Sequence, residues 1–162
     1  MGFEAPLARY REKVKEEWVD YNGHMNVAYY TLIFNLATDV FYPLVGLGEP
    51  YKEKTGNSTF ALEAHTCYQR EGSLGDVVEV TTQLLGFDEK RLHFFNTMRH
   101  AEEGYQMATI ELLSIHVDLS KPKVIPLPDE PMRLLAGMME SHGELPIPPE
   151  VGSVMKVGPK NG

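Results

Sequence analysis

The sequence predicts an α+β fold in which a curved antiparallel sheet of about five strands wraps around one long central helix, with an additional C-terminal helix. Four strand-like segments follow one another across short turns, and short turns favour antiparallel neighbours because parallel strands need long crossovers. One long apolar helix precedes these segments and is available to cover the sheet. The 162 residues suit a single domain, and a hydrophobic content of 43% is enough for a core.

The N-terminal part predicts an edge strand, a turn and the central helix. Residues 14–19 are interpreted as a short edge strand with polar residues outward. The polar turn 20–26 ends at Asn26, which is a favourable N-cap. Apolar side chains then recur at spacings of three and four over residues 27–43, where Asp39 is the single charge. A helix that is apolar around most of its circumference is buried, so we expect the central helix here.

The middle of the chain predicts the sheet. The short polar stretch 50–57 is expected to be a loop. The sequence then becomes rich in alternating apolar and β-branched residues, which is typical of strands. We expect these strands over residues 58–70, 77–87, 91–100 and 106–118.

The C-terminal part predicts a helix and a tail. An amphipathic helix is expected from Asp129, as N-cap, to Ser141, with Gly143 as its stop. Residues 144–162 contain several prolines and glycines without periodicity, so an extended or disordered tail is expected there. We therefore expect one folded domain over residues 1–143.

Composition excludes several classes of protein. The formal net charge of -8 disfavours nucleic acid as the main partner. A single cysteine, Cys67, excludes internal disulfides and a cysteine zinc site, and the histidines have no short metal-ligand spacing. No apolar run approaches the ~20 residues of a membrane span, and the N-terminus lacks a signal peptide. We expect a cytoplasmic protein without a metal or another cofactor.

The most informative segment reads D-Y-N-G-H-M-N-V-A-Y-Y from Asp20 to Tyr30. It places a carboxylate, the imidazole of His24 and the carboxamide of Asn26 just before a buried helix. The N-terminus of a helix presents unpaired backbone N–H groups, which suit an oxyanion that develops from a carbonyl. A nearby carboxylate can act as a general base or a nucleophile. The alternative is a simple capping loop in which Asp20 and Asn26 only satisfy the helix end.

This segment resembles the hotdog-fold acyl-CoA thioesterases related to 4-hydroxybenzoyl-CoA thioesterase. The resemblance rests on the pattern D-x-x-G-H-x-N-x-x-Y and extends over about residues 10–118. The segments L-E-A-H at 62–65, R-H-A-E at 99–102 and H-V-D at 116–118 look most like a subgroup of betainyl-CoA thioesterases, which is linked to carnitine and betaine breakdown.

The resemblance implies hydrolysis of a small acyl-CoA thioester at a site shared between two subunits. It assigns Asp20 as the catalytic carboxylate, with His24 and Asn26 orienting water or holding the carboxylate. The oxyanion donors that it implies are the backbone N–H groups of Val27, Ala28 and Tyr29. A homodimer, or a tetramer formed by two dimers, is expected because it also covers the exposed sheet edge.

Residues for acyl binding are open to two interpretations each. Glu63 faces either solvent or a subunit, or else lines the acyl pocket and pairs with a cationic acyl group. The aromatic residues Trp18, Tyr21 and Tyr30, together with Tyr29, are either core or a site for a quaternary ammonium group, which aromatic faces attract.

Two rival functions remain open at this stage. A hotdog dehydratase or hydratase would use an acid–base pair, but Asp20 and His24 lack the spacing of the hydratase motif. A non-catalytic acyl-CoA-binding module would use the same cleft without releasing thiol. Release of free CoA distinguishes hydrolysis from both.

Overall fold

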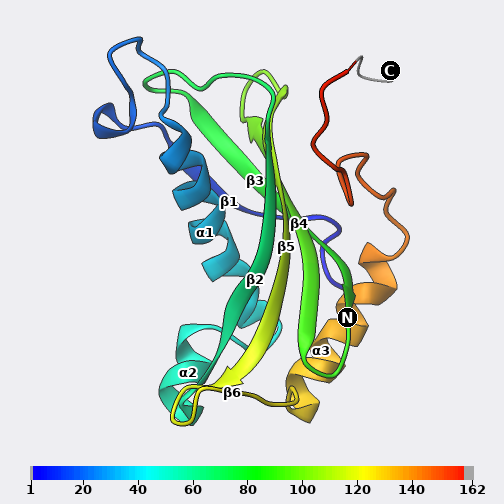
Figure 1. Cartoon of the computed structure of the whole chain (residues 1–162). Helices are drawn as coiled ribbons and strands as arrows, with labels where there is room; N and C mark the ends of the chain where they lie inside the picture. The colour runs from blue at the N-terminus through cyan, green and yellow to red at the C-terminus, as the bar shows by residue number, and fades with distance from the viewer. Residues whose placement is uncertain (1, 159–162) are drawn as a thin grey trace.

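Four long strands form an antiparallel sheet, and helix α1 (Val27–Leu44) lies along one face of it (Figure 1). The coordinates are a computed structural model and describe residues 2–158. The strand order is β1-β3-β4-β5-β2, so β1 and β2 form the two edges, and a short β6 pairs with β5. The strands are β1 (Leu7–Lys13), β2 (Asn57–Tyr68), β3 (Val77–Phe87), β4 (Arg91–His100), β5 (Gln106–Asp118) and β6 (Lys123–Val124).

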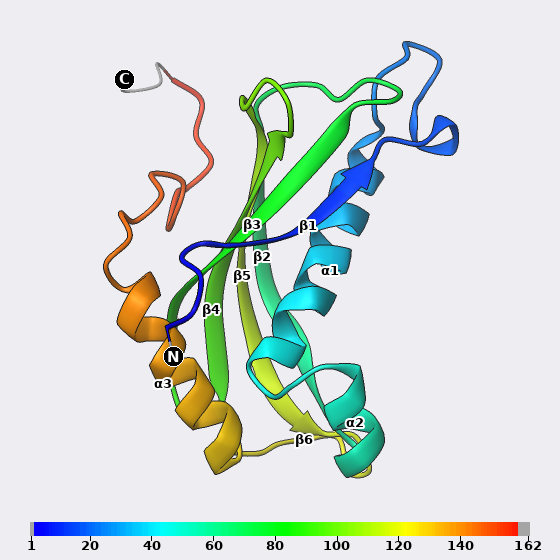
Figure 2. The same cartoon turned by 180° about the vertical axis from the view of Figure 1, so that it is seen from behind.

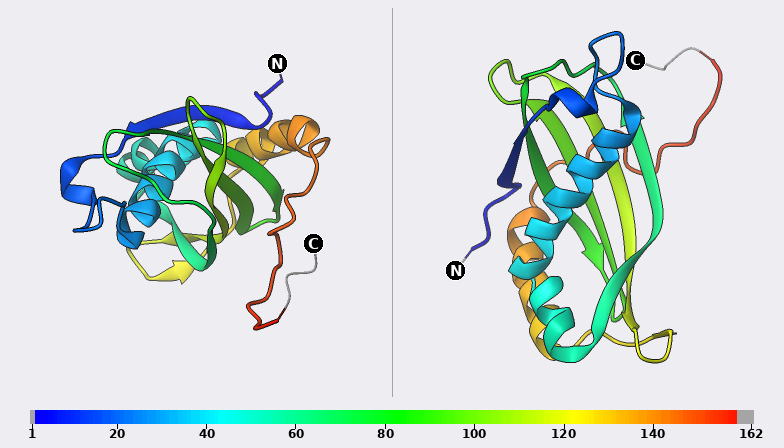
Figure 3. Two further views of the ribbon diagram at one scale, coloured as in Figure 1. Left: turned by 90° about the horizontal axis from the view of Figure 1, so that it is seen from above. Right: turned by 90° about the vertical axis from the view of Figure 1, so that its left-hand side faces the viewer.

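The sheet curls around α1, which Figure 3 shows from above and from the side of the helix. Residues three and four apart on α1 are buried, and Ile33, Phe34 and Phe41 are each at most 1% exposed. The first half of the helix packs in one apolar cluster with β3, β4 and β5, and the second half packs in another with the C-terminal helix. This is the predicted hotdog fold, and the prediction is confirmed.

The predicted first strand is wrong. Residues 14–19 do not form a strand but contain the 3-10 helix η1 (Glu16–Trp18), and the edge strand β1 precedes them. Val14 and Trp18 are both buried, but Glu16, which would share their face in a strand of alternating residues, is exposed together with its two neighbours. Four of the seven residues of β1 are charged, which is compatible with an edge strand, and within the described sheet β1 pairs with β3 alone.

The predicted loop at 50–57 is wrong in part, because α2 (Glu49–Thr55) occupies most of it. Pro50 lies in the first turn of this helix, where a missing N–H is tolerated. Gly56 ends the helix in the left-handed conformation with φ of 74°. These N-terminal and C-terminal signals were present in the sequence, but seven residues are too few to show periodicity.

A bulge interrupts the alternation of β2. Ala61 pairs with Ser114 and Glu63 with Leu113, so Leu62 is the extra residue. An extra residue reverses the parity of a strand. Strict alternation would place Ala61 and Glu63 on one face, but Ala61 lines a cavity beside α1 and Glu63 lines another beside the C-terminal tail. The other three long strands were predicted with their observed bounds.

Helix α3 (Asp129–His142) packs mainly against β3, and the tail continues along the side of the sheet away from α1 (Figure 2). Residues 144–158 form no helix or strand. Their backbone is nevertheless held to the sheet, since Gly152 N donates to Glu111 Oε1 over 2.7 Å and Gln83 Nε2 donates to Pro146 O over 3.3 Å. The last four residues of the predicted tail, 159–162, and Met1 lie outside the described residues.

Within residues 2–158 no single helix is long and apolar enough to cross a membrane. Only α1 and α2 together, bent by 59°, satisfy length and composition.

Candidate active site

The loop before α1 holds the Asp20 carboxylate in a fixed place. Asp20 Oδ1 accepts a hydrogen bond of 2.8 Å from the backbone N–H of Asn22. Two backbone bonds of 2.9 Å close the loop, from Asp20 N to His24 O and from Gly23 N to Asp20 O. Gly23 has a φ of +78°, which favours glycine there. The carboxylate is half-buried, so it is oriented by the backbone and still reached by water.

The start of α1 offers fewer free donors than predicted. Asn26 Oδ1 accepts from Ala28 N over 3.0 Å, and Asn26 O accepts from Tyr29 N over 3.0 Å. Two of the three predicted oxyanion N–H groups therefore already have acceptors. The N–H of Val27 has none among the described residues, and the Val27 side chain is 58% exposed. Of the three predicted donors, the Val27 N–H alone is left without an acceptor among the described residues, and Asn26 is the N-cap of α1.

His24 faces a different carboxylate from the one predicted. Its Nε2 lies 3.3 Å from Oε2 of Glu71, and both side chains are exposed. Only its backbone N–H approaches Asp20 Oδ1, at 3.4 Å. The imidazole is thus near the loop but is not hydrogen-bonded to the catalytic candidate.

The predicted aromatic residues do not gather around one space that could hold a quaternary ammonium group. Trp18 is 4% exposed and stacks on Tyr29 with the planes at 18°, under the ammonium group of Lys15. Tyr30 is 4% exposed, and its hydroxyl donates to Arg70 O and accepts from Gly72 N. Tyr21, at 98% exposure, points into solvent. The core interpretation holds for Trp18 and Tyr30.

Glu63 lies apart from these residues, in a cavity of about 430 Å³ on the face of the sheet that the tail covers. Within this cavity His93 Nε2 is 2.7 Å from Glu111 Oε2, and Ser153 Oγ is 3.2 Å from His65 Nδ1. Burial opposes ionisation of Glu111, but the bond from the tail and the contact with His93 lower its pKa overall. Neither Asp20 nor any other residue of the loop before α1 lines this cavity.

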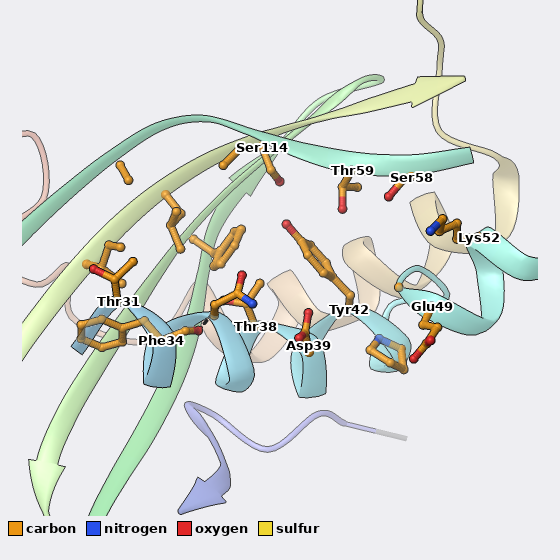
Figure 4. Close-up of a pocket in the computed structure, with 18 of the residues that line it drawn as sticks. Thr31, Phe34, Thr38, Asp39, Tyr42, Glu49, Lys52, Ser58, Thr59 and Ser114 are labelled. Atoms are coloured by element: carbon orange, nitrogen blue, oxygen red, sulfur yellow. Dashed lines mark hydrogen bonds between the residues drawn. The ribbon is translucent and has the colours of Figure 1, made fainter. Parts of the chain in front are cut away.

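A larger cavity, of about 780 Å³, lies between α1 and the edge strand β2 (Figure 4). Its α1 wall consists of residues three and four apart, which share one face of a helix. None of the predicted site residues lines it. The lining of the α1 wall is Thr31, Phe34, Asn35, Thr38, Asp39 and Tyr42, and the sheet wall includes Thr59, Ala61, Ala64, Phe94, Ile110, Leu112 and Ser114.

The cavity contains charged and unsatisfied polar groups that sequence reasoning missed. Burial first, and repulsion by Glu49 second, raise the pKa of the Asp39 carboxyl. Burial likewise raises the pKa of the Tyr42 phenol. Ser114 is 1% exposed, and its hydroxyl has no partner among the described residues. One sequence signal was available, because Asp39 is the single charge in an otherwise apolar helix.

Comparison with known proteins now identifies the family. The model described as "Thioesterase-like superfamily" matches residues 14–136. The chain belongs to the thioesterase-like superfamily. Together with the curated relatives, this membership makes the thioesterase-like chain a thioester hydrolase.

Two curated relatives of this thioesterase-like chain cover nearly all of it. A betainyl-CoA thioesterase of Pseudomonas aeruginosa is 39% identical over 153 residues, which are 94% of this chain and 96% of that protein. An L-carnitine dehydrogenase/betainyl-CoA thioesterase of Rhizobium meliloti is 37% identical over 147 residues, which are 91% of this chain but 29% of that longer protein.

Two solved structures are similar over almost the whole thioesterase-like chain. A hypothetical protein of Staphylococcus aureus, solved in complex with CoA, has a TM-score of 0.88 and 27% identity, with 98% of this chain and 100% of that chain covered. A proposed thioesterase of Pseudomonas putida KT2440 has a TM-score of 0.83 and 35% identity, with 97% and 100% covered.

Proposed function

We propose that this thioester hydrolase cleaves betainyl-CoA to betaine and CoA, with Asp20 as its catalytic carboxylate. The observation that carries the mechanism is the Asp20 carboxylate, which is fixed by backbone N–H groups in the loop that leads to the free N–H of Val27. The betainyl-CoA thioesterase at 39% identity supports the substrate, and the relative solved with CoA supports the coenzyme.

The reaction requires one base and one oxyanion donor. Asp20 removes a proton from water while the water oxygen attacks the thioester carbon. The Val27 N–H donates to the carbonyl oxygen as it gains negative charge. The carbon–sulfur bond then breaks and the sulfur leaves as a thiolate, whose thiol has a pKa of about 8.5, so little protonation is needed. In a covalent variant, Asp20 attacks the carbon itself and water hydrolyses the resulting anhydride.

The site is completed in this proposal by a second copy of the chain. Strand β2 is a sheet edge of 12 residues, and Phe60 and Leu62 on it are each 51% exposed. A long apolar edge of this kind is a template for pairing, and a two-fold axis would pair two β2 strands antiparallel. The α1 helices of the two copies would then run antiparallel beside one another on the same face of the joined sheet.

This pairing brings the loop of one chain to the cavity of the other. Tyr68, at one end of β2, packs on Tyr30 near the start of α1. Thr59, at the other end of β2, lines the large cavity together with Tyr42. A two-fold axis near the middle of β2 therefore carries Asp20 of one subunit toward the cavity of its partner. The further pairing of two such dimers into a tetramer stays a prediction.

Subunit complementation tests the proposal. A chain with Asp20→Asn lacks the carboxylate, and a chain with Thr59→Trp has its cavity filled. Each is expected to release almost no CoA from betainyl-CoA, measured with a thiol reagent. After mixed refolding, half of the dimers are mixed and each holds one intact site, so roughly a quarter of the wild-type activity should return.

Two results would contradict parts of the proposal. If the mixture stays inactive while mixed dimers are detected by mass, the site lies within one chain. If wild-type protein binds acyl-CoA and releases no thiol from betainyl-CoA or acetyl-CoA, hydrolysis itself is wrong for these substrates.

A further inference from the structure

We infer that Asp39, together with Glu49, makes the large cavity selective for an acyl group that carries a fixed positive charge. The inference rests on the proposed function, because it takes this cavity as the acyl site. It adds a specificity determinant that acts on the substrate and takes no part in cleaving the bond.

Asp39 is held in the cavity wall without a cation to pair with. Neither Asp39 nor Glu49 forms an ion pair among residues 2–158, although Lys52 also lines the cavity. In Figure 4 Lys52 lies at the α2 end, near Ser58, and Asp39 lies on α1 below the Tyr42 ring. The carboxylates of Asp39 and Glu49 outnumber the ammonium group of Lys52, so the lining of the cavity carries a net negative charge.

The surroundings of Asp39 disfavour its ionised form. Partial burial and the repulsion from Glu49 both disfavour the ionised form of Asp39, and both raise its pKa. A bound cation would reverse this, because an opposite charge within a few ångströms favours the carboxylate. Asp39 is exposed toward the cavity, so a cation that enters the cavity can reach its carboxylate.

The buried hydroxyl of Ser114 is independent evidence that a ligand enters here. Its Oγ has no hydrogen bond of standard geometry among residues 2–158, and Figure 4 draws it on the sheet wall facing the Tyr42 hydroxyl, whose pKa it lowers. Burying a hydroxyl without a hydrogen-bond partner costs free energy. A carbonyl of the ligand, or a water molecule that enters with the ligand, would supply the missing hydrogen bond. The cavity volume of about 780 Å³ is within the range for small-molecule sites and exceeds the volume of a betainyl group.

The aromatic rings of the wall suit the same ligand. Tyr42 and Phe94 meet edge-on with centroids 6.0 Å apart. A quaternary ammonium has no N–H to donate, so carboxylate charge and aromatic faces are the groups that can recognise it. The two carboxylates and the two rings together define the chemical class of the acyl group.

A pair of isosteric substrates tests this inference. In 3,3-dimethylbutyryl-CoA a carbon replaces the nitrogen of betainyl-CoA, so the two acyl groups have one shape and differ by one charge. Wild-type protein should prefer betainyl-CoA in kcat/KM. Asp39→Asn should lower the ratio of the two kcat/KM values by roughly tenfold to a hundredfold, through loss for betainyl-CoA alone. Glu49→Gln should lower the ratio less, because it leaves Asp39 in place.

Controls separate failure of this inference from failure of the proposed function. Glu53→Gln removes one negative charge from α2 outside the cavity and should leave the ratio unchanged. Asp20→Asn should lower kcat/KM about a thousandfold for both substrates and so leave their ratio unchanged. If Asp39→Asn lowers both kcat/KM values equally, or if the wild type does not discriminate, Asp39 is not a specificity residue, and the role of Asp20 stands. If Asp20→Asn stays fully active, the proposed mechanism is wrong.

Discussion

The two ends of helix α1 have opposite properties. At the N-terminal end lie the Asp20 carboxylate and the N–H of Val27, and neither residue lines the cavity beside β2 or the cavity under the tail. At the C-terminal half, Asp39 and Tyr42 line a large cavity that contains no base positioned beside an oxyanion donor. Twelve residues separate Val27 from Asp39, or roughly 18 Å along the axis at 1.5 Å per residue. Under the proposed function these two ends are the two halves of one site, and within one chain they lie too far apart to act together.

Removing the carboxylate at the N-terminal end should have the largest effect. Asp20→Asn keeps a side-chain oxygen that can accept from Asn22 N, so the loop should be preserved. We expect kcat to fall by about a thousandfold, within the usual range for loss of a general base. Release of CoA measures this, and circular dichroism checks the fold. A loss of activity that follows a loss of folded protein would not support the catalytic role.

Separating two chains should have the next largest effect, because it divides the two halves of the site. Phe60→Lys with Leu62→Lys places charge on the exposed edge of β2 without touching the core. We expect a folded monomer with activity lowered by about a hundredfold, by light scattering and the CoA assay. An active monomer would contradict the shared site.

Acid pH should loosen the C-terminal half of α1 before its N-terminal end. His142 on α3 is 1% exposed, accepts from Leu84 N through Nδ1 and contacts Glu4 O through Nε2. Burial lowers the pKa of His142. The unfolded chain therefore binds a proton more readily, and the free energy of unfolding should fall as pH drops below about 6.5.

Hydrogen exchange at pH 5 and pH 7 checks this difference between the two halves of α1. His142→Gln cannot titrate and should flatten the dependence in this range. Equal loss of protection along all of α1 would show that the two halves unfold together.

The smallest effect expected is a gain in stability from Asp39→Asn at neutral pH. The pKa of Asp39 is raised in the folded protein. Its contribution to the free energy of unfolding is therefore most favourable at low pH and is lost as the pH rises through this raised pKa. The variant should resist urea slightly better than the wild type at pH 7 and equally below about pH 4. A less stable variant at pH 7 would mean that Asp39 stabilises the fold instead of serving a ligand.

Local patterns were sufficient where one periodicity extended over many residues. The apolar spacing of α1 and the alternation of β3, β4 and β5 predicted these elements with nearly their observed bounds. Two short elements were not predicted, since α2 has only seven residues and β1 has four charges among seven residues, three of them consecutive. The bulge at Leu62 was also not predicted, because an extra residue in one strand is recognised only when its pairing with the neighbouring strand is known.

The sequence by itself determined the curled sheet around one helix and the position of Asp20 before that helix, because both depend on residues close together in the chain. Only the tertiary structure decided that Trp18 and Tyr30 belong to the core and that Asp39 faces a cavity. Burial and cavities depend on how distant segments pack: α1 packs on β1 and β3 and leaves a cavity beside β2 and β5, and no local periodicity encodes which face of a helix remains uncovered.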